Sequence, residues 1–279
     1  MAIMHFDLRA GLVSVLSLLS DFGLKDPYVA EMKAVIYSIN PDASIIDISH
    51  EVKKFDIRMG AFVLASAAPY FPAKSVHVTV VDPGVGTSRR PIIVETAHSF
   101  YVGPDNGVLM LAASKEKISS VYEIVNPEYM LSVVSSTFHG RDIFAPAATH
   151  LSLGVSPSSF GSLLDDYVFP DFAKPKVEDG LLAGDVLYVD DFGNVVSNIS
   201  AQNLVDAGLD LCRHVDVVLG AETVCLPLGS AYGNVSVGAA LVLVGGTGFV
   251  EVAVNQGSAS RMFGVNVGDC FSVSVPRSQ

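Results

Sequence analysis

The chain has 279 residues, of which 50% are hydrophobic and 16% are charged, so it can bury a large core, and this argues against wholesale disorder. Seventeen basic and 29 acidic residues give a formal net charge of −12, which argues against a nucleic-acid partner and against adhesion to an anionic membrane. The three cysteines, Cys212, Cys225 and Cys270, show no CxxC spacing and suggest neither a disulfide framework nor a zinc site.

No apolar run approaches the roughly 18–20 residues of a membrane helix. The apolar stretch from Leu12 to Leu19 could pass for the core of a signal peptide. However, Asp7 precedes it, no strongly basic start exists, and Ser20–Asp21 follows where a small-x-small cleavage site should lie. We therefore interpret the stretch as a buried strand and expect a cytoplasmic protein.

The first part of the chain alternates short apolar runs with segments of helical periodicity. Strands are predicted over 13–19, 44–48 and 76–81, and helices over 27–39 and 55–68. The first helix is expected to have Asp26 as its N-cap and Pro27 at its first position. This β-α-β-α-β pattern implies a parallel sheet with right-handed crossovers.

Two further runs, 91–96 and 99–102, look like strands joined by a tight turn, so the sheet is expected to be mixed. Another strand is predicted over 121–124. The stretch from Thr137 to Asp142 opens a helix whose inner face includes Phe144 and Leu151. We expect an N-terminal α/β domain over residues 1–165, with a central, mostly parallel, mixed sheet.

The character of the sequence changes towards the C-terminus. Prolines, serines and acidic residues suggest a linker over 166–180. After it, β-rich runs alternate with glycine-rich turns, and strands are predicted over 186–189, 215–219, 240–244, 249–254 and 271–275. One short helix is expected, near Ala201 to Ala207. These features predict an all-β domain, a small barrel or a sandwich, over residues 181–279.

One stretch, HVTVVDPGVGTSRR from His77 to Arg90, carries the strongest local signal. Asp82 ends a buried strand, glycines follow that allow close approach of a ligand, and Arg89 closes the loop. Open α/β sheets bind ligands at the carboxyl edge of their strands, where Asp21 would also lie. An Asp there could accept hydrogen bonds from a ribose diol, and Asp82 with Arg89 and His139 could hold and deprotonate a water.

Each of these residues also has a plainer interpretation. Asp21 and Asp82 could only cap turns, Arg89 could form a surface ion pair, and a single histidine is more often structural. In the second domain, YVDDFGNVVSN offers Asp190, the aromatic ring of Phe192 and the amide of Asn194, which together suit a purine or an amino-acid head group. An ordinary β-hairpin with DFGN as its turn explains the same residues. GxSxG, Walker and complete GxGxxG motifs do not occur.

Six motifs together resemble one family: LLSDFGLKDPYVAEMKAVIYSINP, IIDISHEV, VVDPGVGTSRR, GPDNGVL, TFHGRDIFAPAA and YVDDFGNVVSN. Their order is similar to that of the S-adenosyl-L-methionine (SAM) hydroxide adenosyltransferases, relatives of the SAM-dependent fluorinase and chlorinase. The resemblance runs from about Val13 to the C-terminus. It implies an N-terminal α/β domain and a C-terminal β-barrel, no metal or redox cofactor, and a homotrimer that binds SAM between the N-domain of one subunit and the C-domain of the next.

The resemblance also implies roles for individual residues. Asp21 matches the acid that binds the ribose diol, and Phe55 and Phe138 match aromatic positions near the ribose and the reacting carbon. The water-activating trio is matched by Asp82, Arg89 and His139. The C-domain matches are Asp190 and Asn194 at the methionine part, and Phe192 and Asn255 around the adenine.

Two differences from the halogenases favour water as the nucleophile. Those enzymes have a tyrosine where this chain has Asp82 and a threonine where it has Val85. A carboxylate repels halide but accepts a proton from water. The resemblance therefore implies hydrolysis of SAM to adenosine and L-methionine by attack on ribose C5′. The alternatives are a halide-using SAM lyase of the same fold and a SAM- or adenosine-binding sensor without turnover.

Overall fold

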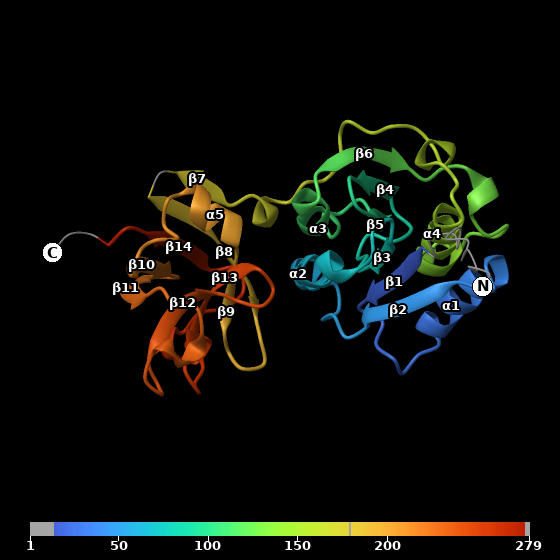
Figure 1. The fold of residues 1–279 in the computed structure, drawn as a ribbon. Helices are drawn as coiled ribbons and strands as arrows, with labels where there is room; N and C mark the ends of the chain where they lie inside the picture. Colours follow the sequence, from blue (N-terminus) through green and yellow to red (C-terminus); the bar gives the residue numbers. More distant parts are fainter. Residues whose placement is uncertain (1–13, 179, 277–279) are drawn as a thin grey trace, which may run out of the picture. The chain divides into compact units, whose positions relative to one another are not determined.

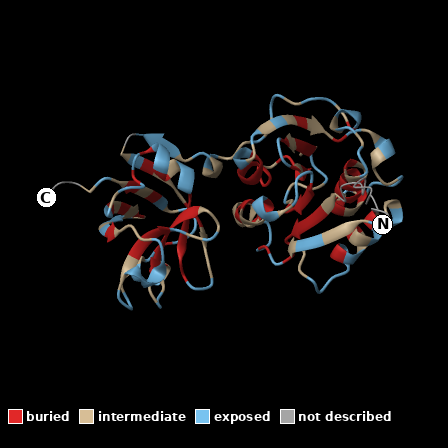
Figure 2. Cartoon of the chain, in the orientation of Figure 1, coloured by how far each residue is buried: buried red, intermediate tan, exposed pale blue. Residues whose placement is uncertain are grey.

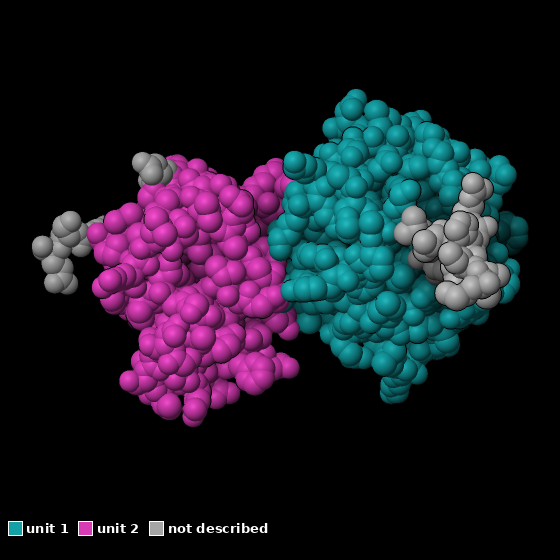
Figure 3. Space-filling view, viewed as in Figure 1, with its two compact units in different colours: residues 1–168 teal, residues 169–279 magenta. Residues whose placement is uncertain are grey.

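A computed structural model describes residues 14–178 and 180–276 of the chain (Figure 1). The chain divides into two compact units, residues 1–168 and 169–279, which Figure 3 colours separately. The predicted domain bounds and linker stay predictions, and a short strand, β7 (Lys176–Glu178), lies within the predicted linker. In the described ranges we find no helix with the length and apolar character needed to span a membrane.

The N-terminal unit is built on a mixed sheet whose described strands follow the order β2-β1-β3-β5-β4-β6. The strands are β1 (Val15–Ser20), β2 (Ser44–Ser49), β3 (Val76–Val80), β4 (Pro91–Thr96), β5 (Phe100–Pro104) and β6 (Ile118–Glu123). β1 runs parallel to β2 and β3, and β3 parallel to β5, whereas β4 is antiparallel to β5 and β6. The predicted mixed sheet with parallel central strands is confirmed.

Helices cover both faces of this sheet. They are α1 (Tyr28–Ile39), α2 (Ile57–Ala67), α3 (Met110–Lys115) and α4 (Ala145–Ser152), and one π-helical turn (Gly140–Phe144) precedes α4. α1 packs against α4, and α2 packs against α3 (Figure 1). Alternate residues of β1, Leu16 and Leu18, join Met32 and Ile36 of α1 in one buried cluster. Because helices cover the faces of the sheet, a ligand can approach it at the carboxyl ends of β1 and β3.

One sequence prediction for this unit is wrong, and one helix has no counterpart among the predicted elements. Pro27, not Asp26, is the N-cap of α1, and no side-chain hydrogen bond caps this end, so the predicted Asp26 cap is wrong. Asp26 instead lines a pocket described below. α3 was not predicted, because Met110, Leu111, Ala112 and Ala113 are all buried and leave no amphipathic period.

The C-terminal unit is an antiparallel sheet whose described strands follow the order β11-β10-β14-β8-β9-β13-β12, with β7 added beside β8. Its strands are β8 (Leu181–Val189), β9 (Val195–Ser200), β10 (His214–Leu219), β11 (Glu222–Pro227), β12 (Ala240–Val244), β13 (Phe249–Val254) and β14 (Cys270–Ser274). A bridge between Leu228 and Val242 joins the two ends of the series. The sheet thus nearly closes into the predicted barrel, around the buried strand residues that Figure 2 shows in red.

The prediction of a single short helix in this unit is wrong. α5 (Ala201–Asp206) is present, and α6 (Ala259–Phe263) is a second helix among the described residues. α6 begins where Ser258 accepts a hydrogen bond from the backbone N–H of Arg261, and it ends at Gly264 with φ of 64°. Five residues between a serine cap and a glycine are too few to show a hydrophobic period.

Candidate active site

The N-terminal unit holds a cavity of about 330 Å³ where β1 and β3 end. The segments that line it follow β1, precede α2, follow β3, and precede the π-helical turn. Five of the predicted site residues line it: Asp21, Phe55, Asp82, Phe138 and His139. The carboxyl ends of adjacent parallel strands therefore bring together residues up to about 120 positions apart, as the topology predicts.

Arg89 links Asp82 to His139 beside this cavity. Its Nε donates to Asp82 Oδ1 at 3.0 Å, and its Nη2 donates to Asp82 Oδ2. The same Nη2 lies 3.0 Å from His139 Nδ1. The Arg89 and Asp82 side chains are only 6% and 5% exposed, and the guanidinium lies over the ring of Phe144. The structure thus brings Asp82, Arg89 and His139 together: the first two form a buried ion pair, and Arg89 also contacts the His139 imidazole.

The contact with Arg89 also fixes the protonation pattern of His139. A guanidinium can only donate, so His139 Nδ1 is an acceptor and the neutral ring carries its proton on Nε2. Burial lowers the pKa of His139, and the positive charge of Arg89 lowers it further, against the opposite effect of Asp82 and Asp142. The imidazole is therefore neutral at pH 7 and offers an N–H donor.

The loop that carries this arrangement depends on one glycine. Gly86 has a φ of 74°, and a Cβ built there would lie 2.1 Å from the backbone oxygen of Ser136. A side chain would therefore push the 82–89 loop away from the segment that leads to His139.

Asp21 is held by the segment before α2. Its side chain is buried, and Oδ2 accepts a hydrogen bond from the backbone N–H of Phe55 at 2.8 Å. Lys54 Nζ donates to the backbone oxygen of Asp21. Phe55 has a φ of 65°, uncommon for a residue with a side chain, and the residue is 68% exposed. Such outliers persist where the surroundings enforce them, and they cluster at functional sites.

An aromatic cluster forms one wall of the cavity. The rings of Phe22, Tyr28 and Phe138 contact one another with centroids 5.2–5.6 Å apart. Sequence reasoning named only Phe138. Phe22 and Tyr28 could also have been predicted as site residues, because both lie close to Asp21 in the chain, just after β1. The cavity thus combines three carboxylates, those of Asp21, Asp26 and Asp82, with an apolar wall.

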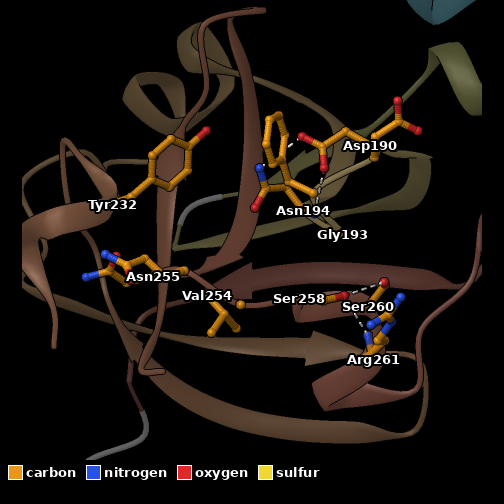
Figure 4. Close-up of a pocket in the computed structure, with 13 residues that line it drawn as sticks. Asp190, Gly193, Asn194, Tyr232, Val254, Asn255, Ser258, Ser260 and Arg261 are labelled. Atoms are coloured by element: carbon orange, nitrogen blue, oxygen red, sulfur yellow. Dashed lines mark hydrogen bonds between the residues drawn. The ribbon is translucent and has the colours of Figure 1, made fainter. Parts of the chain in front are cut away.

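A second pocket, of about 900 Å³, lies in the C-terminal unit (Figure 4). The four predicted C-domain residues line it: Asp190, Phe192, Asn194 and Asn255. The backbone turns between Asp190 and Asn194, as in the hairpin alternative, and the residues of this turn also line the pocket.

Hydrogen bonds orient the polar groups of this pocket. Asp190 accepts from the backbone N–H of Asn194 at 2.8 Å and from its Nδ2 at 2.9 Å. Asn255 Nδ2 donates to the backbone oxygen of Val235. The ring of Phe192 makes no such contact with the described residues, and Phe192 is 81% exposed. Gly193 packs against Ser258, since a Cβ there would lie 2.0 Å from Ser258 Oγ.

Sequence reasoning missed two residues that line this pocket. Tyr232 donates to Glu251 Oε1 at 2.8 Å, and burial raises the pKa of that glutamate. Arg261, on α6, has no ion-pair partner among the described residues. Its only sequence signal was that it is a single cation in the stretch GSASRMFG.

The described side chains include no group of three or more His, Cys, Asp and Glu placed to hold a metal ion. The polar side chains that line the two pockets are instead carboxylates, amides, hydroxyls, one imidazole and single cations.

Comparison with known proteins agrees with this architecture. The model of the SAM hydroxide adenosyltransferase N-terminal domain matches residues 16–161, and that of the C-terminal domain matches residues 184–272. The (R)-S-adenosyl-L-methionine hydrolase of Salinispora tropica is 39% identical over 93% of this chain and 97% of its own length. A fluorinase of an Actinoplanes species is 25% identical, over 93% of this chain and 97% of its own length.

A solved structure extends the similarity to three dimensions. The crystal structure of an uncharacterized conserved protein from Thermotoga maritima has a TM-score of 0.83 and 41% sequence identity, and covers 93% of this chain and all of that one. The sequence motifs, the mixed sheet joined to a β-barrel and the two family models agree, and the chain belongs to the SAM hydroxide adenosyltransferase family.

Proposed function

We propose that this protein hydrolyses SAM to adenosine and L-methionine. The observation that carries the proposal is the buried Asp82 carboxylate, paired with Arg89 and facing a cavity that also holds Asp21. The relatives named (R)-S-adenosyl-L-methionine hydrolase are more similar to this chain than the fluorinases are, at 35–39% against 25–26% identity. A carboxylate at this place favours water over halide as the nucleophile.

In the proposed reaction, a water oxygen attacks C5′ of the ribose in line with the C5′–S bond. The electron pair of that bond moves to the sulfonium sulfur, methionine leaves as a neutral thioether, and Asp82 accepts the proton from water. Departure of a thioether needs no general acid, so the protein mainly orients the reactants and excludes solvent. Neutral His139 donates from Nε2 and helps to position the water, while Arg89 fixes both partners.

Substrate binding in this proposal uses both pockets. Asp21 accepts hydrogen bonds from the ribose hydroxyls, and the aromatic rings of Phe55 and Phe138 contact the sugar and the reacting carbon. In the C-terminal unit, Asp190 and Asn194 bind the amino-acid part of SAM, and Phe192 and Asn255 surround the adenine. Support for these roles comes from the motif resemblance and from the place of each residue in a pocket wall.

The proposal includes a homotrimer in which the N-terminal unit of one subunit and the C-terminal unit of the next bind the same SAM molecule. It also includes a cytoplasmic location, where SAM is available as a substrate. Neither a nucleic acid nor a membrane takes part.

Incubation of the purified protein with SAM, followed by chromatography of the nucleosides, tests the function. Adenosine and methionine in equal amounts, in buffer without halide, are expected. Formation of a 5′-halogenated nucleoside that requires added chloride or fluoride would favour the halogenase alternative. Tight binding of SAM without adenosine release would favour a sensor.

A further inference from the structure

A β-bulge brings His50 beside the end of β1. β1 and β2 pair in parallel up to Leu18 and Asp47, and the register then shifts so that Leu19 pairs with Ser49. Because of this shift, His50, which directly follows β2, reaches the last residue of β1. Ser20 Oγ and His50 Nδ1 lie 2.8 Å apart, and both residues are buried, at 1% and 4% exposure.

The other side of the imidazole faces a carboxylate. His50 Nε2 lies 3.2 Å from Asp47 Oδ1, and Asp47 Oδ2 accepts from Lys33 Nζ. The contact between His50 Nε2 and Asp47 Oδ1 lacks hydrogen-bond geometry and is electrostatic. The negative charge still favours the tautomer with the proton on Nε2, and His50 Nδ1 then accepts from the Ser20 hydroxyl. Ser20 Oγ in turn accepts from the backbone N–H of Phe22 at 3.3 Å.

These contacts bind the turn after β1 on both sides of Asp21. Ser20 comes immediately before Asp21, and Gly23, two residues after it, donates its backbone N–H to the His50 backbone oxygen at 2.7 Å. Asp21 lines the cavity, whereas Ser20 and His50 lie outside its lining. A buried serine and a buried histidine outside the cavity lining therefore contact the turn that carries the Asp21 carboxylate.

We propose that His50 is a positioning residue, which holds the Ser20–Gly23 turn so that Asp21 can bind the substrate hydroxyls. The inference rests on the proposed function, in which Asp21 binds the ribose. A role in packing alone is the competing explanation for a buried histidine, and the sequence offers a matched comparison. On the same strand, Ser17 Oγ lies 2.7 Å from Nδ1 of another buried histidine, His77, and among the described residues this pair makes no hydrogen bond to the Ser20–Gly23 turn.

The test measures kcat and KM for SAM in Ser20→Ala, His50→Leu and His50→Asn, with Ser17→Ala as the control. Loss of the contact is expected to raise KM about tenfold in Ser20→Ala and His50→Leu, with kcat changed less than about threefold. His50→Asn, whose amide oxygen can replace Nδ1 as acceptor, should restore most of the affinity. Ser17→Ala should keep the parent KM.

A double-mutant cycle separates positioning from packing. In an Asp21→Ala background, Ser20→Ala should no longer change KM, because the group that it positions is already absent. Unchanged KM values in the single variants, an equal increase in Ser17→Ala, or additive effects with Asp21→Ala would each overturn the inference. If His50→Leu does not fold, Ser20→Ala decides alone. A parent protein that releases no adenosine would instead refute the proposed function, and the inference with it.

Discussion

Arg89 binds both carboxylate oxygens of Asp82, from Nε to Oδ1 and from Nη2 to Oδ2. This bidentate pair holds the carboxylate in one plane and leaves each oxygen a second lone pair for a water. The pair is buried, so removal of one partner leaves a charge without its counter-ion. Asparagine at position 82 would be an imperfect isostere, because its NH₂ group would face the N–H groups of Arg89.

Asp82→Asn should lower kcat by roughly 10²–10⁴-fold, the usual contribution of a positioned acid–base group. SAM affinity should change much less, because in the proposed reaction Asp82 contacts the water and not the bulk of the substrate. Adenosine release and SAM binding are measured on the same preparation. An active Asp82→Asn enzyme would remove Asp82 from the mechanism, together with the main argument for water over halide.

A matched control for this variant exists elsewhere in the same unit. Arg90 donates from Nε and Nη2 to Asp105 Oδ2, at 3.1 and 2.7 Å, and the Asp105 side chain is 3% exposed. Asp105→Asn therefore disturbs a comparable Arg–Asp pair outside the cavity lining. It should lower thermal stability as Asp82→Asn does, yet leave kcat within about threefold of the parent.

Asp21→Ala should weaken nucleoside binding more than it slows the chemical step. Loss of a charge-assisted contact with the ribose removes roughly 1.5–3 kcal/mol, or about 10–150-fold in affinity. Calorimetric titration with adenosine measures this without turnover. Asp26→Ala, which removes another acid from the wall of the same cavity, is the control and should bind adenosine nearly as the parent does. Equal affinity of Asp21→Ala and the parent would contradict the role of Asp21.

Elements with a clear hydrophobic pattern, such as a continuous buried strand or an amphipathic helix, could be predicted from the sequence. β3 is buried throughout and is β-branched except for His77, so it could be recognised as a strand from the sequence. α3 could not, because its four consecutive buried residues have no polar face to set a helical period. α6 is shorter than two turns, and only its caps, Ser258 and Gly264, mark it.

The sequence indicated many of the residues that the structure brings together at the two pockets, but not their hydrogen bonds. Asp82 and Arg89 lie seven residues apart around glycines, so their pairing followed from the loop. The contact of Arg89 with His139 spans 50 residues and fixes a tautomer, which no local pattern could show. Arg261 and Tyr232 were missed because each lies far along the chain from the Asp190–Asn194 turn that lines the same pocket.

Arg261→Gln should raise the KM for SAM about tenfold and leave kcat at saturation nearly unchanged. Arg261 is a cation without an ion-pair partner among the described residues, and it lines the pocket proposed for the amino-acid part of SAM, so a carboxylate is its natural ligand. Adenosine lacks that carboxylate, and its affinity should not change. Arg213→Gln, at an exposed arginine outside this pocket, is the control. Equal losses for SAM and adenosine would place Arg261 at the nucleoside instead.

His77 should make the N-terminal unit less stable in acid. Burial lowers the pKa of His77 from 6.5 to about 4, and the nearby His98 adds to the shift. Between pH 6.5 and 4, His77 is therefore protonated in the unfolded chain but not in the folded chain, so the free energy of unfolding falls as pH falls through this window. The full loss amounts to roughly 3 kcal/mol. Urea unfolding at pH 7 and pH 4.5 measures it, and in His77→Gln the fall should be smaller.

The protein should be an active trimer, with a mass by light scattering of three times the 29.4 kDa of one chain. In the proposed assembly, each site combines Asp82 of one subunit with the pocket around Arg261 of the next. Mixed trimers of Asp82→Asn chains and Arg261→Gln chains should then contain some sites with both residues intact, and at low SAM they should be more active than either variant alone. If one chain supplied the whole site, every site in the mixture would carry one of the two changes, and mixing would restore nothing. An active monomer would refute the shared site directly.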